Sequence, residues 1–177
     1  MQHAIVINVA EKADYKLLAD LGRRAFEEAF GRFNDPGDLQ TYLDLAFHPE
    51  TIRSQLQNPL YTFLLATWDE EPVGYAKLFR GECPEPVRVK SCIQLERIYA
   101  LQSYVGRKVG KSLMEHCVEI AKAEHFERIW LTVWQQNEVA ITFYKKWHFE
   151  VVGTKKFTIG KEINDDYIMS LDVNKIQ

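Results

Sequence analysis

Residues 96–149 read ERIYALQSYVGRKVGKSLMEHCVEIAKAEHFERIWLTVWQQNEVAITFYKKWHF, and this stretch decides the fold class. It opens within a strand, CIQLERIYAL (92–101), and continues as a helix over residues 109–125. One face of that helix is apolar, at Val109, Leu113, Cys117, Ile120 and Ala121. A second strand, RIWLTVW (128–134), and a second helix, EVAITFYKKW (138–147), follow. Strand, helix, strand and helix in close succession predict an α/β domain in which helices cover both faces of a mixed sheet.

Two further helices are predicted before this stretch. Asp14 caps the first of them, which carries an apolar stripe and ends where FNDPGD (33–38) interrupts the pattern. Asp38 opens the second helix, which continues to Phe47. The N-terminal part of the chain is therefore mainly helical.

The remaining elements are strands. AIVINV (4–9) predicts the first strand, and TFLLATWDEEPVGYAKLF (62–79) predicts a hairpin that turns at Asp69 to Pro72. Two more strands follow the last helix, at FEVVGTKKFTIG (149–160) and NDDYIMSLDV (164–173). Together with the two strands of the central stretch, these segments are expected to form a mixed sheet.

Composition excludes several classes of protein. The chain has 177 residues, 46% apolar and 27% charged, and fits a single domain over residues 1–177. Its net charge of −3 disfavours a general nucleic-acid binder, which needs a basic face. The first apolar run breaks at Glu11 and Lys12, and LYTFLLATW (60–68) is far shorter than the ~20 residues of a membrane span. We therefore expect a cytoplasmic protein with no signal peptide and no membrane partner.

The three cysteines, Cys83, Cys92 and Cys117, lack the spacing of metal ligands. In a reducing cytosol they predict buried free thiols, with no disulfide and no metal. Cys92 has no histidine in a recognisable pairing motif, so we expect no covalent enzyme intermediate.

The segment YVGRKVGKS (104–112) is similar to a nucleotide-binding loop but is one residue too short. A Walker A loop has four residues between its glycines, whereas three separate Gly106 from Gly110. A shorter loop does not wrap phosphates in the same way, and no Walker B aspartate is evident, so nucleotide hydrolysis is disfavoured. A turn that leads into a helix N-terminus still attracts an anion, with Arg107, Lys108 and Lys111 adding positive charge. The open alternative is an ordinary glycine turn that caps a helix.

The second half of the stretch ends in a longer motif. Six positions match the pattern N-x-x-A-x-x-F-Y-x-K-x-G-F, namely Asn137, Ala140, Phe143, Tyr144, Lys146 and Phe149. With the preceding strand and glycine turn, this motif resembles the GNAT superfamily of N-acetyltransferases. The segments AFEEAFGRFNDPGDLQTYLDLAF (25–47) and LERIY (95–99) resemble the PaiA-type spermine/spermidine acetyltransferases. The resemblance implies a GNAT-like fold with a mixed, mostly antiparallel sheet of about seven strands, a substrate side in residues 1–90 and an acetyl-CoA-binding half in 91–177.

Three positions depart from the family pattern. Val105 stands where Gln or Arg is usual, and Lys108 and His148 stand where glycine is usual. Because left-handed backbone conformations favour glycine, we expect the backbone of Lys108 to avoid them.

The resemblance implies acetyl-CoA as co-substrate and assigns residues to it. The backbone of Ile98, Tyr99 and Ala100 holds the pantetheine arm as an added strand would be held. The turn and helix start bind the pyrophosphate, at Gly106, Arg107, Lys108, Val109, Gly110 and Lys111. Asn137 and Lys146 also contact the cofactor. Their alternatives are a helix N-cap for Asn137 and an exposed helical lysine for Lys146.

Acetyl transfer to an amine requires a base for the ammonium proton and an acid for the leaving thiolate. Glu96 is the candidate base, directly or through water, and its alternative is an ion pair with Arg97, Arg80 or Lys77. Tyr144 is the candidate acid, since the resemblance places it at the cofactor sulfur. Helical periodicity alone makes it a core tyrosine.

The expected acceptor is a primary amine, with spermidine or spermine favoured. Glu27, Phe30 and Asp35 are the candidate substrate residues, among acidic and aromatic side chains that also suit a solvated helix face or simple packing. Alternatives are a peptide or protein amine, another small amine, or a non-catalytic acyl-CoA sensor. No nucleic-acid partner is expected, and a homodimer is compatible with the sequence.

Overall fold

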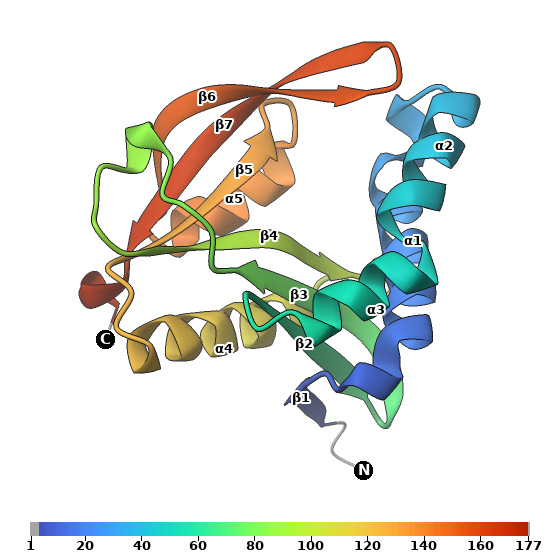
Figure 1. Cartoon of the computed structure of the whole chain (residues 1–177), viewed down its shortest axis with the longest axis horizontal. Coiled ribbons are helices and arrows are strands. Elements are labelled where there is room, and N and C mark those ends of the chain that lie inside the picture. Colours follow the sequence, from blue (N-terminus) through green and yellow to red (C-terminus); the bar gives the residue numbers. More distant parts are fainter. Residues whose placement is uncertain (1–3, 177) are drawn as a thin grey trace.

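One sheet of seven strands in the order β1-β2-β3-β4-β5-β7-β6 organises the molecule (Figure 1). The computed structural model describes residues 4–176. The strands are β1 (Ile5–Val9), β2 (Tyr61–Trp68), β3 (Glu71–Phe79), β4 (Cys92–Ala100), β5 (Arg128–Trp134), β6 (Glu150–Ile159) and β7 (Glu162–Asp172). All neighbours are antiparallel except β4 and β5, which are parallel. The predicted mixed, mostly antiparallel sheet is confirmed.

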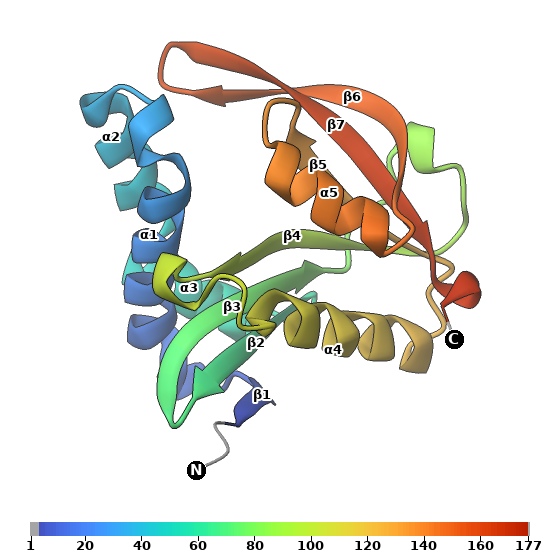
Figure 2. The same cartoon turned by 180° about the vertical axis from the view of Figure 1, so that it is seen from behind.

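Within residues 4–176, five α-helices cover the two faces of this sheet (Figures 1 and 2). They are α1 (Tyr15–Phe30), α2 (Pro36–Ala46), α3 (Pro49–Gln57), α4 (Val109–Ala123) and α5 (Glu138–Lys146). Helices α1–α3 pack on one face around Phe26, Phe63 and Tyr75, and α4 and α5 pack on the other around Leu113 and Tyr144. The predicted helices on both faces are confirmed.

The helical region before β2 differs from its prediction in two respects. Helix α2 begins at Pro36, and its N-cap is Asp35, whose Oδ1 accepts hydrogen bonds from the amides of Gly37 (2.9 Å) and Asp38 (3.1 Å). Asp38 lies inside the helix, so its prediction as the opening residue is wrong. Helix α3 was not predicted, although Pro49 at its first position is a typical start signal.

The β2–β3 hairpin turns on two residues, Asp69 and Glu70, with φ of 49° and 70°. The predicted turn extended to Pro72, which instead lies in β3 opposite Thr67. A two-residue turn with positive φ at both positions matches the right-handed twist of the strands it joins.

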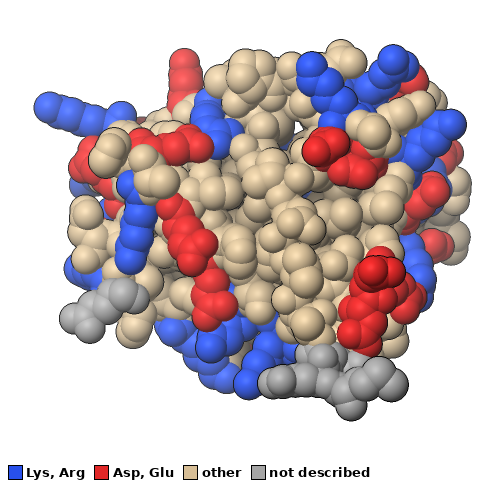
Figure 3. Space-filling view, turned by 90° about the horizontal axis from the view of Figure 1, so that it is seen from below, with Lys and Arg blue, Asp and Glu red and all other residues tan. Residues whose placement is uncertain are grey.

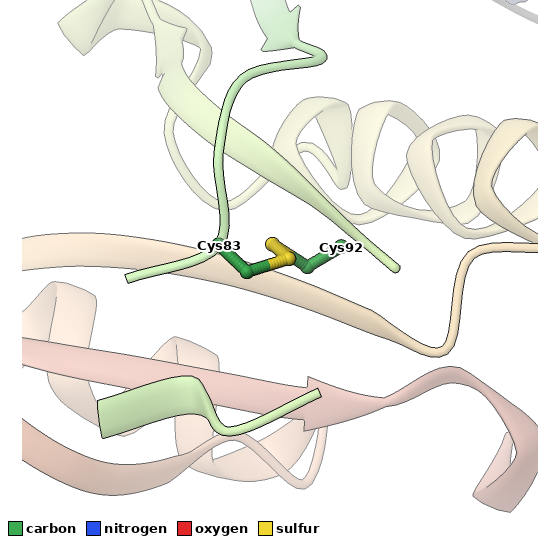
Figure 4. The surroundings of a disulfide bond; sticks show 2 residues. All are labelled: Cys83 and Cys92. Atoms are coloured by element: carbon green, nitrogen blue, oxygen red, sulfur yellow. A yellow bond between two sulfur atoms is a disulfide. The ribbon is translucent and has the colours of Figure 1, made fainter. Parts of the chain in front are cut away.

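Two of the three cysteines form a disulfide, which overturns the prediction of free thiols for this pair. Cys83 and Cys92 are bonded with their Cα atoms 5.7 Å apart, and the bond ties the loop after β3 to the first residue of β4 (Figure 4). The sequence did not reveal the pair because the loop must fold back on β4 before the sulfurs meet. Cys117 is free and buried, as predicted.

The described residues include no helix long and apolar enough to cross a membrane. Within residues 4–176 no group of three or more His, Cys, Asp or Glu side chains is arranged to hold a metal ion. On the face seen from below, the coloured residues show small basic and acidic groups around an uncharged centre (Figure 3).

Candidate active site

The two parallel strands at the middle of the sheet separate. Strands β4 and β5 pair only at Cys92–Arg128, Ile93–Ile129 and Gln94–Trp130. Beyond that point β4 continues to Ala100 and β5 to Trp134, each paired only with its other neighbour. Alternate backbone N–H and C=O groups along both strands therefore face a gap between them. Such groups need a hydrogen-bonding partner, and an extended amide chain is one that fits.

A turn with two left-handed residues connects β4 to α4. Gly106 has φ of 85°, and Lys108, the N-cap of α4, has φ of 67° and ψ of 10°. The expectation that Lys108 avoids the left-handed region is wrong, because the turn into α4 requires that conformation whichever residue stands there. His148 also has positive φ, 66°, so both substituted glycine positions are left-handed.

The start of α4 presents free amides. Among residues 4–176 the N–H groups of Val109, Gly110 and Lys111 have no hydrogen-bond partner, whereas Ser112 donates to the Lys108 carbonyl at 3.0 Å. The end of β4 therefore leads through a glycine turn to an unpaired helix N-terminus, which is an anion-binding arrangement.

Side chains from α1 and β3 hold the turn between β4 and α4 in place. Glu28 of α1 accepts a hydrogen bond from the Gln102 amide at 2.7 Å, and the Tyr104 hydroxyl donates to Glu71 at 2.8 Å. Arg107, predicted to face the anion, stacks its guanidinium 5.4 Å from the centre of the Trp68 ring and 5.3 Å from that of Tyr104.

Tyr144 lies on the buried face of α5. Its ring packs against Phe143 and Phe149, with ring centres 5.5 and 5.6 Å away. Its hydroxyl makes no hydrogen bond with any residue of the described chain. Burial raises the pKa of the Tyr144 phenol well above its ordinary value, with a smaller contribution from Cys117, so the group stays protonated at neutral pH.

Glu96 sits at a bulge. Lys77 pairs with Arg97 and Leu78 with Leu95, so Glu96 is the extra residue of β4. Glu96 and Arg97 consequently both point toward α1–α3, where Glu96 Oε2 lies 2.5 Å from Lys77 Nζ and Arg97 lies over the Phe47 ring. Burial lowers the pKa of Lys77, and the Glu96 carboxylate opposes that effect. The ion pair is one of the partners foreseen for Glu96.

Asn137 and Lys146, the candidates at the two ends of α5, show the features of their alternative roles as a helix N-cap and an exposed lysine. Asn137 caps α5, with its Oδ1 accepting from the Ala140 amide at 3.2 Å, and Lys146 is exposed in the last turn. Neither observation tests a contact with a cofactor.

Most of the acidic residues of α1 and α2 have structural partners. Glu28 holds the Gln102 amide, Asp35 caps α2, and Asp38 accepts from the Lys161 amide at 3.1 Å. Asp44 pairs with Arg23. Glu27 is exposed, and no residue in the 4–176 range pairs with it.

Phe30 lies with Phe26 and Tyr99 in an aromatic wall beside β4. Its ring centre is 4.7 Å from that of Phe26 and 6.1 Å from that of Tyr99. An aromatic wall along this face suits apolar parts of a ligand and ammonium groups alike.

Asp166 of β7 was missed by sequence reasoning. It is 7% exposed, and burial raises the pKa of its carboxyl from 3.8 to about 6, with Lys155 lowering it and Asp165 raising it. The acidic pair in NDDYIMSLDV reads as an ordinary strand end, because only the packing of β7 between β5 and β6 buries the second carboxylate.

Comparison with known proteins identifies the family to which this fold and site belong. Residues 23–149 match the model of the acetyltransferase (GNAT) family. The chain belongs to the GNAT acetyltransferase family. Among curated relatives, this acetyltransferase is 30% identical over 152 residues to an uncharacterised N-acetyltransferase of Mycobacterium bovis, covering 86% of this chain and 93% of the relative. It is 26% identical over 164 residues to an uncharacterised N-acetyltransferase of Lactobacillus delbrueckii, covering 93% and 94%.

Solved structures share the fold of this acetyltransferase at low identity. The PaiA N-acetyltransferase of Thermoplasma acidophilum, in complex with coenzyme A, matches with a TM-score of 0.74 at 21% identity over 96% of this chain and 99% of that one. The yncA protein of Salmonella typhimurium, with acetyl-CoA, matches with a TM-score of 0.67 at 18% identity over 97% and 95%. The seven-stranded GNAT fold is thereby confirmed, and the protein is an N-acetyltransferase of that family.

Proposed function

We propose that this protein transfers the acetyl group of acetyl-CoA to a primary amine by direct attack on the thioester. The observation that carries the proposal is the separation of β4 from β5 beyond Gln94 and Trp130, which ends beside the free amides of α4. An elongated ligand with a peptide-like arm and an anionic end suits both features. The PaiA and yncA structures hold coenzyme A and acetyl-CoA, which supports the same assignment here.

The residues of the chain fit coenzyme A. The edge of β4 at Ile98, Tyr99 and Ala100 offers backbone groups to the pantetheine amides, and the free N–H groups of Val109, Gly110 and Lys111 are offered to the pyrophosphate. When bound, acetyl-CoA supplies an activated acetyl thioester. A backbone N–H on the open edge of β4 serves as the oxyanion donor.

Two side chains perform the proton transfers in this proposal. Glu96 accepts the ammonium proton, directly or through water, with the Lys77 ammonium holding its carboxylate in place. Tyr144 donates its phenolic proton to the departing thiolate. Burial keeps this phenol protonated at neutral pH, so the proton is present when the thiolate forms, although the same raised pKa makes the phenol a weaker acid. The hydroxyl has no hydrogen-bond partner among residues 4–176 and is not among the unpaired polar atoms fully sealed from solvent, which supports its availability to a ligand atom.

For the acceptor we favour a polyamine such as spermidine or spermine. The resemblance of residues 25–47 and 95–99 to PaiA-type enzymes and the aromatic wall at Phe30 and Tyr99 support it. The carboxylates of α1 and α2 support it less than their number suggests, because Glu28 and Asp38 are engaged within the fold.

The test measures release of free CoA from acetyl-CoA with spermidine, a lysine-containing peptide and an arylamine as acceptors. Spermidine is expected to react with the highest kcat/KM. Preference for the peptide would assign a protein or peptide acceptor instead. Thermal stabilisation by acetyl-CoA without CoA release for any amine would identify a non-catalytic sensor. Stabilisation by ATP with magnesium, and none by CoA, would refute the cofactor assignment.

A further inference from the structure

Asp166 is a buried carboxylate with no hydrogen-bond or ion-pair partner among residues 4–176. It is 7% exposed, no residue between 4 and 176 donates a hydrogen bond to it, and no Lys or Arg nitrogen in that range lies within 4.0 Å of it. The ion pair of this hairpin joins Lys156 to the neighbouring Asp165 at 2.9 Å instead. Its oxygens are not among the unpaired polar atoms that are fully sealed from solvent, so they keep some exposure.

The strand register places Asp166 on the face that α1–α3 cover. Asp166 lies opposite Trp134 of β5, and directly opposed residues in an antiparallel pair share a face. Trp134 meets Phe33, from the turn between α1 and α2, edge to face with ring centres 5.1 Å apart. The even-numbered neighbour Ile168 packs with Trp130 on this face, whereas Met169 and Leu171 face α4.

Aromatic rings flank the carboxylate on its other side as well. Lys155 of β6 lies opposite Asp166, and Phe157, two residues further along β6, shares its face. The Phe157 ring meets that of Tyr42 in α2 at 6.0 Å, edge to face. Asp166 therefore lies between two pairs of aromatic rings that join the sheet to the α1–α2 region.

Charge makes this arrangement specific for a cation. With a pKa of about 6 the carboxyl group is mainly ionised near pH 7.5, although it is buried. Its titratable neighbours are Lys155 and Asp165, of which Lys155 is exposed and forms no ion pair with it. A buried ion without a partner is unfavourable, and a bound ammonium group would remove that penalty.

The position along the strand separates this group from the closed end of the gap between β4 and β5. Trp134 lies four residues beyond Trp130, where β5 last pairs with β4. At about 3.3 Å per residue this is ~13 Å along the strand. The carboxylate is thus remote from the closed end of the gap, near which Glu96 lies, so an acceptor whose reacting amine lies at Glu96 would meet it only with a distal part.

We infer that Asp166 is a specificity-determining residue that binds a second, non-reacting ammonium group of the acceptor, within the aromatic frame of Trp134, Phe33, Phe157 and Tyr42. This inference rests on the proposed amine acetylation and names its acceptor class as diamines and polyamines rather than monoamines.

The test compares Asp166→Asn with the wild type on spermidine, 1,4-diaminobutane and butylamine. Loss of a charged hydrogen-bonded contact is expected to lower kcat/KM for spermidine and the diamine about 10- to 100-fold. The value for butylamine should change less than about threefold, because a monoamine has no distal charge. Asp165→Asn is the matched control and should leave all three unchanged, since Asp165 is exposed and paired with Lys156.

A binding measurement keeps the inference separate from the proposed activity. Spermidine alone should raise the melting temperature of the wild type and of Asp165→Asn but not of Asp166→Asn. Absence of acetylation for every amine, with this pattern intact, would overturn the proposed function and leave the cation site standing. Equal losses for spermidine and butylamine, or an unchanged spermidine value, would overturn the role of Asp166. If Asp166→Asn does not fold, Asp166→Ser provides the same comparison.

Discussion

Replacing Lys108 with glycine is expected to stabilise the protein. Lys108 has φ of 67° and ψ of 10°, a left-handed conformation at the N-cap of α4. That conformation costs an L-residue about 1–2 kcal/mol, from which glycine is exempt. Glycine loses about 0.5–1 kcal/mol more conformational entropy on folding, so the net gain in the free energy of unfolding is about 0.5–1 kcal/mol.

The assay is urea and thermal unfolding of Lys108→Gly beside Lys108→Ala. Alanine removes the ammonium but retains the strained backbone, so its stability should stay within about 0.5 kcal/mol of the wild type. The glycine variant should melt about 1–4 °C higher than the alanine variant. Acetyl-CoA affinity should fall by a similar factor, about 2- to 5-fold, in both variants, because both lose one exposed positive charge near the helix N-terminus.

Two control variants test whether the gain in stability comes from the left-handed backbone at residue 108. His148→Gly removes a second left-handed residue, with φ of 66°, and should stabilise similarly without weakening acetyl-CoA binding. Lys111→Gly places glycine inside α4 and should destabilise by about 1 kcal/mol. A glycine variant at 108 that is no more stable than the alanine variant would refute the claim that the backbone at this turn is strained.

Three further variants test the site. Tyr144→Phe should lower kcat about 100-fold and leave the acetyl-CoA affinity unchanged. The melting temperature should change little, because the hydroxyl has no partner among residues 4–176. An unchanged kcat would exclude Tyr144 as the acid. Glu96→Gln should lower the free energy of unfolding by about 3 kcal/mol, because it leaves the buried Lys77 ammonium without its carboxylate partner. In urea unfolding, the double variant with Lys77→Met should recover much of that loss. The folded pKa of Asp166, about 6 against 3.8 unfolded, gives stability that is full below pH 3.8 and lost as pH rises through 6. Asp166→Asn should therefore raise the unfolding free energy at pH 7.5 by about 1–3 kcal/mol, which corresponds to several degrees in melting temperature. At pH 4 the same substitution should change the melting temperature little. An equal effect at both pH values would contradict the raised pKa.

The local elements of the cofactor half were predictable because their signals are local. The apolar stripe through Val109 and Leu113 marks a helix by periodicity alone, and α4 spans Val109–Ala123. Short polar caps were less reliable, since Asp35 and Asp38 both suit a helix start and only the backbone decides between them. The break between α2 and α3 was hidden because His48 alone separates Phe47 from Pro49.

The sequence named candidate site residues, and the structure shows how their side chains are arranged. Tyr144 is buried with a free hydroxyl, which its helical position allowed but did not establish. The partner of Glu96 remained open among three basic residues until the bulge at β4 set it beside Lys77. Arg107 stays a predicted anion contact, and its guanidinium stacks on Trp68 from the β2–β3 hairpin.

By itself the amino-acid sequence determined the alternation of strands and helices, the glycine turn before α4 and the motif from Asn137 to Phe149. These features depend on residues close together in the chain, where hydrogen-bond periodicity and turn geometry are encoded. Only the tertiary structure decided where β4 leaves β5, that Cys83 meets Cys92, that Lys108 is left-handed, and that Asp166 is buried without an ion-pair partner among residues 4–176. Each of these depends on how segments far apart in the chain pair and pack against one another. Packing decides whether a carboxylate is solvated at the surface or buried as a charge that a ligand would stabilise.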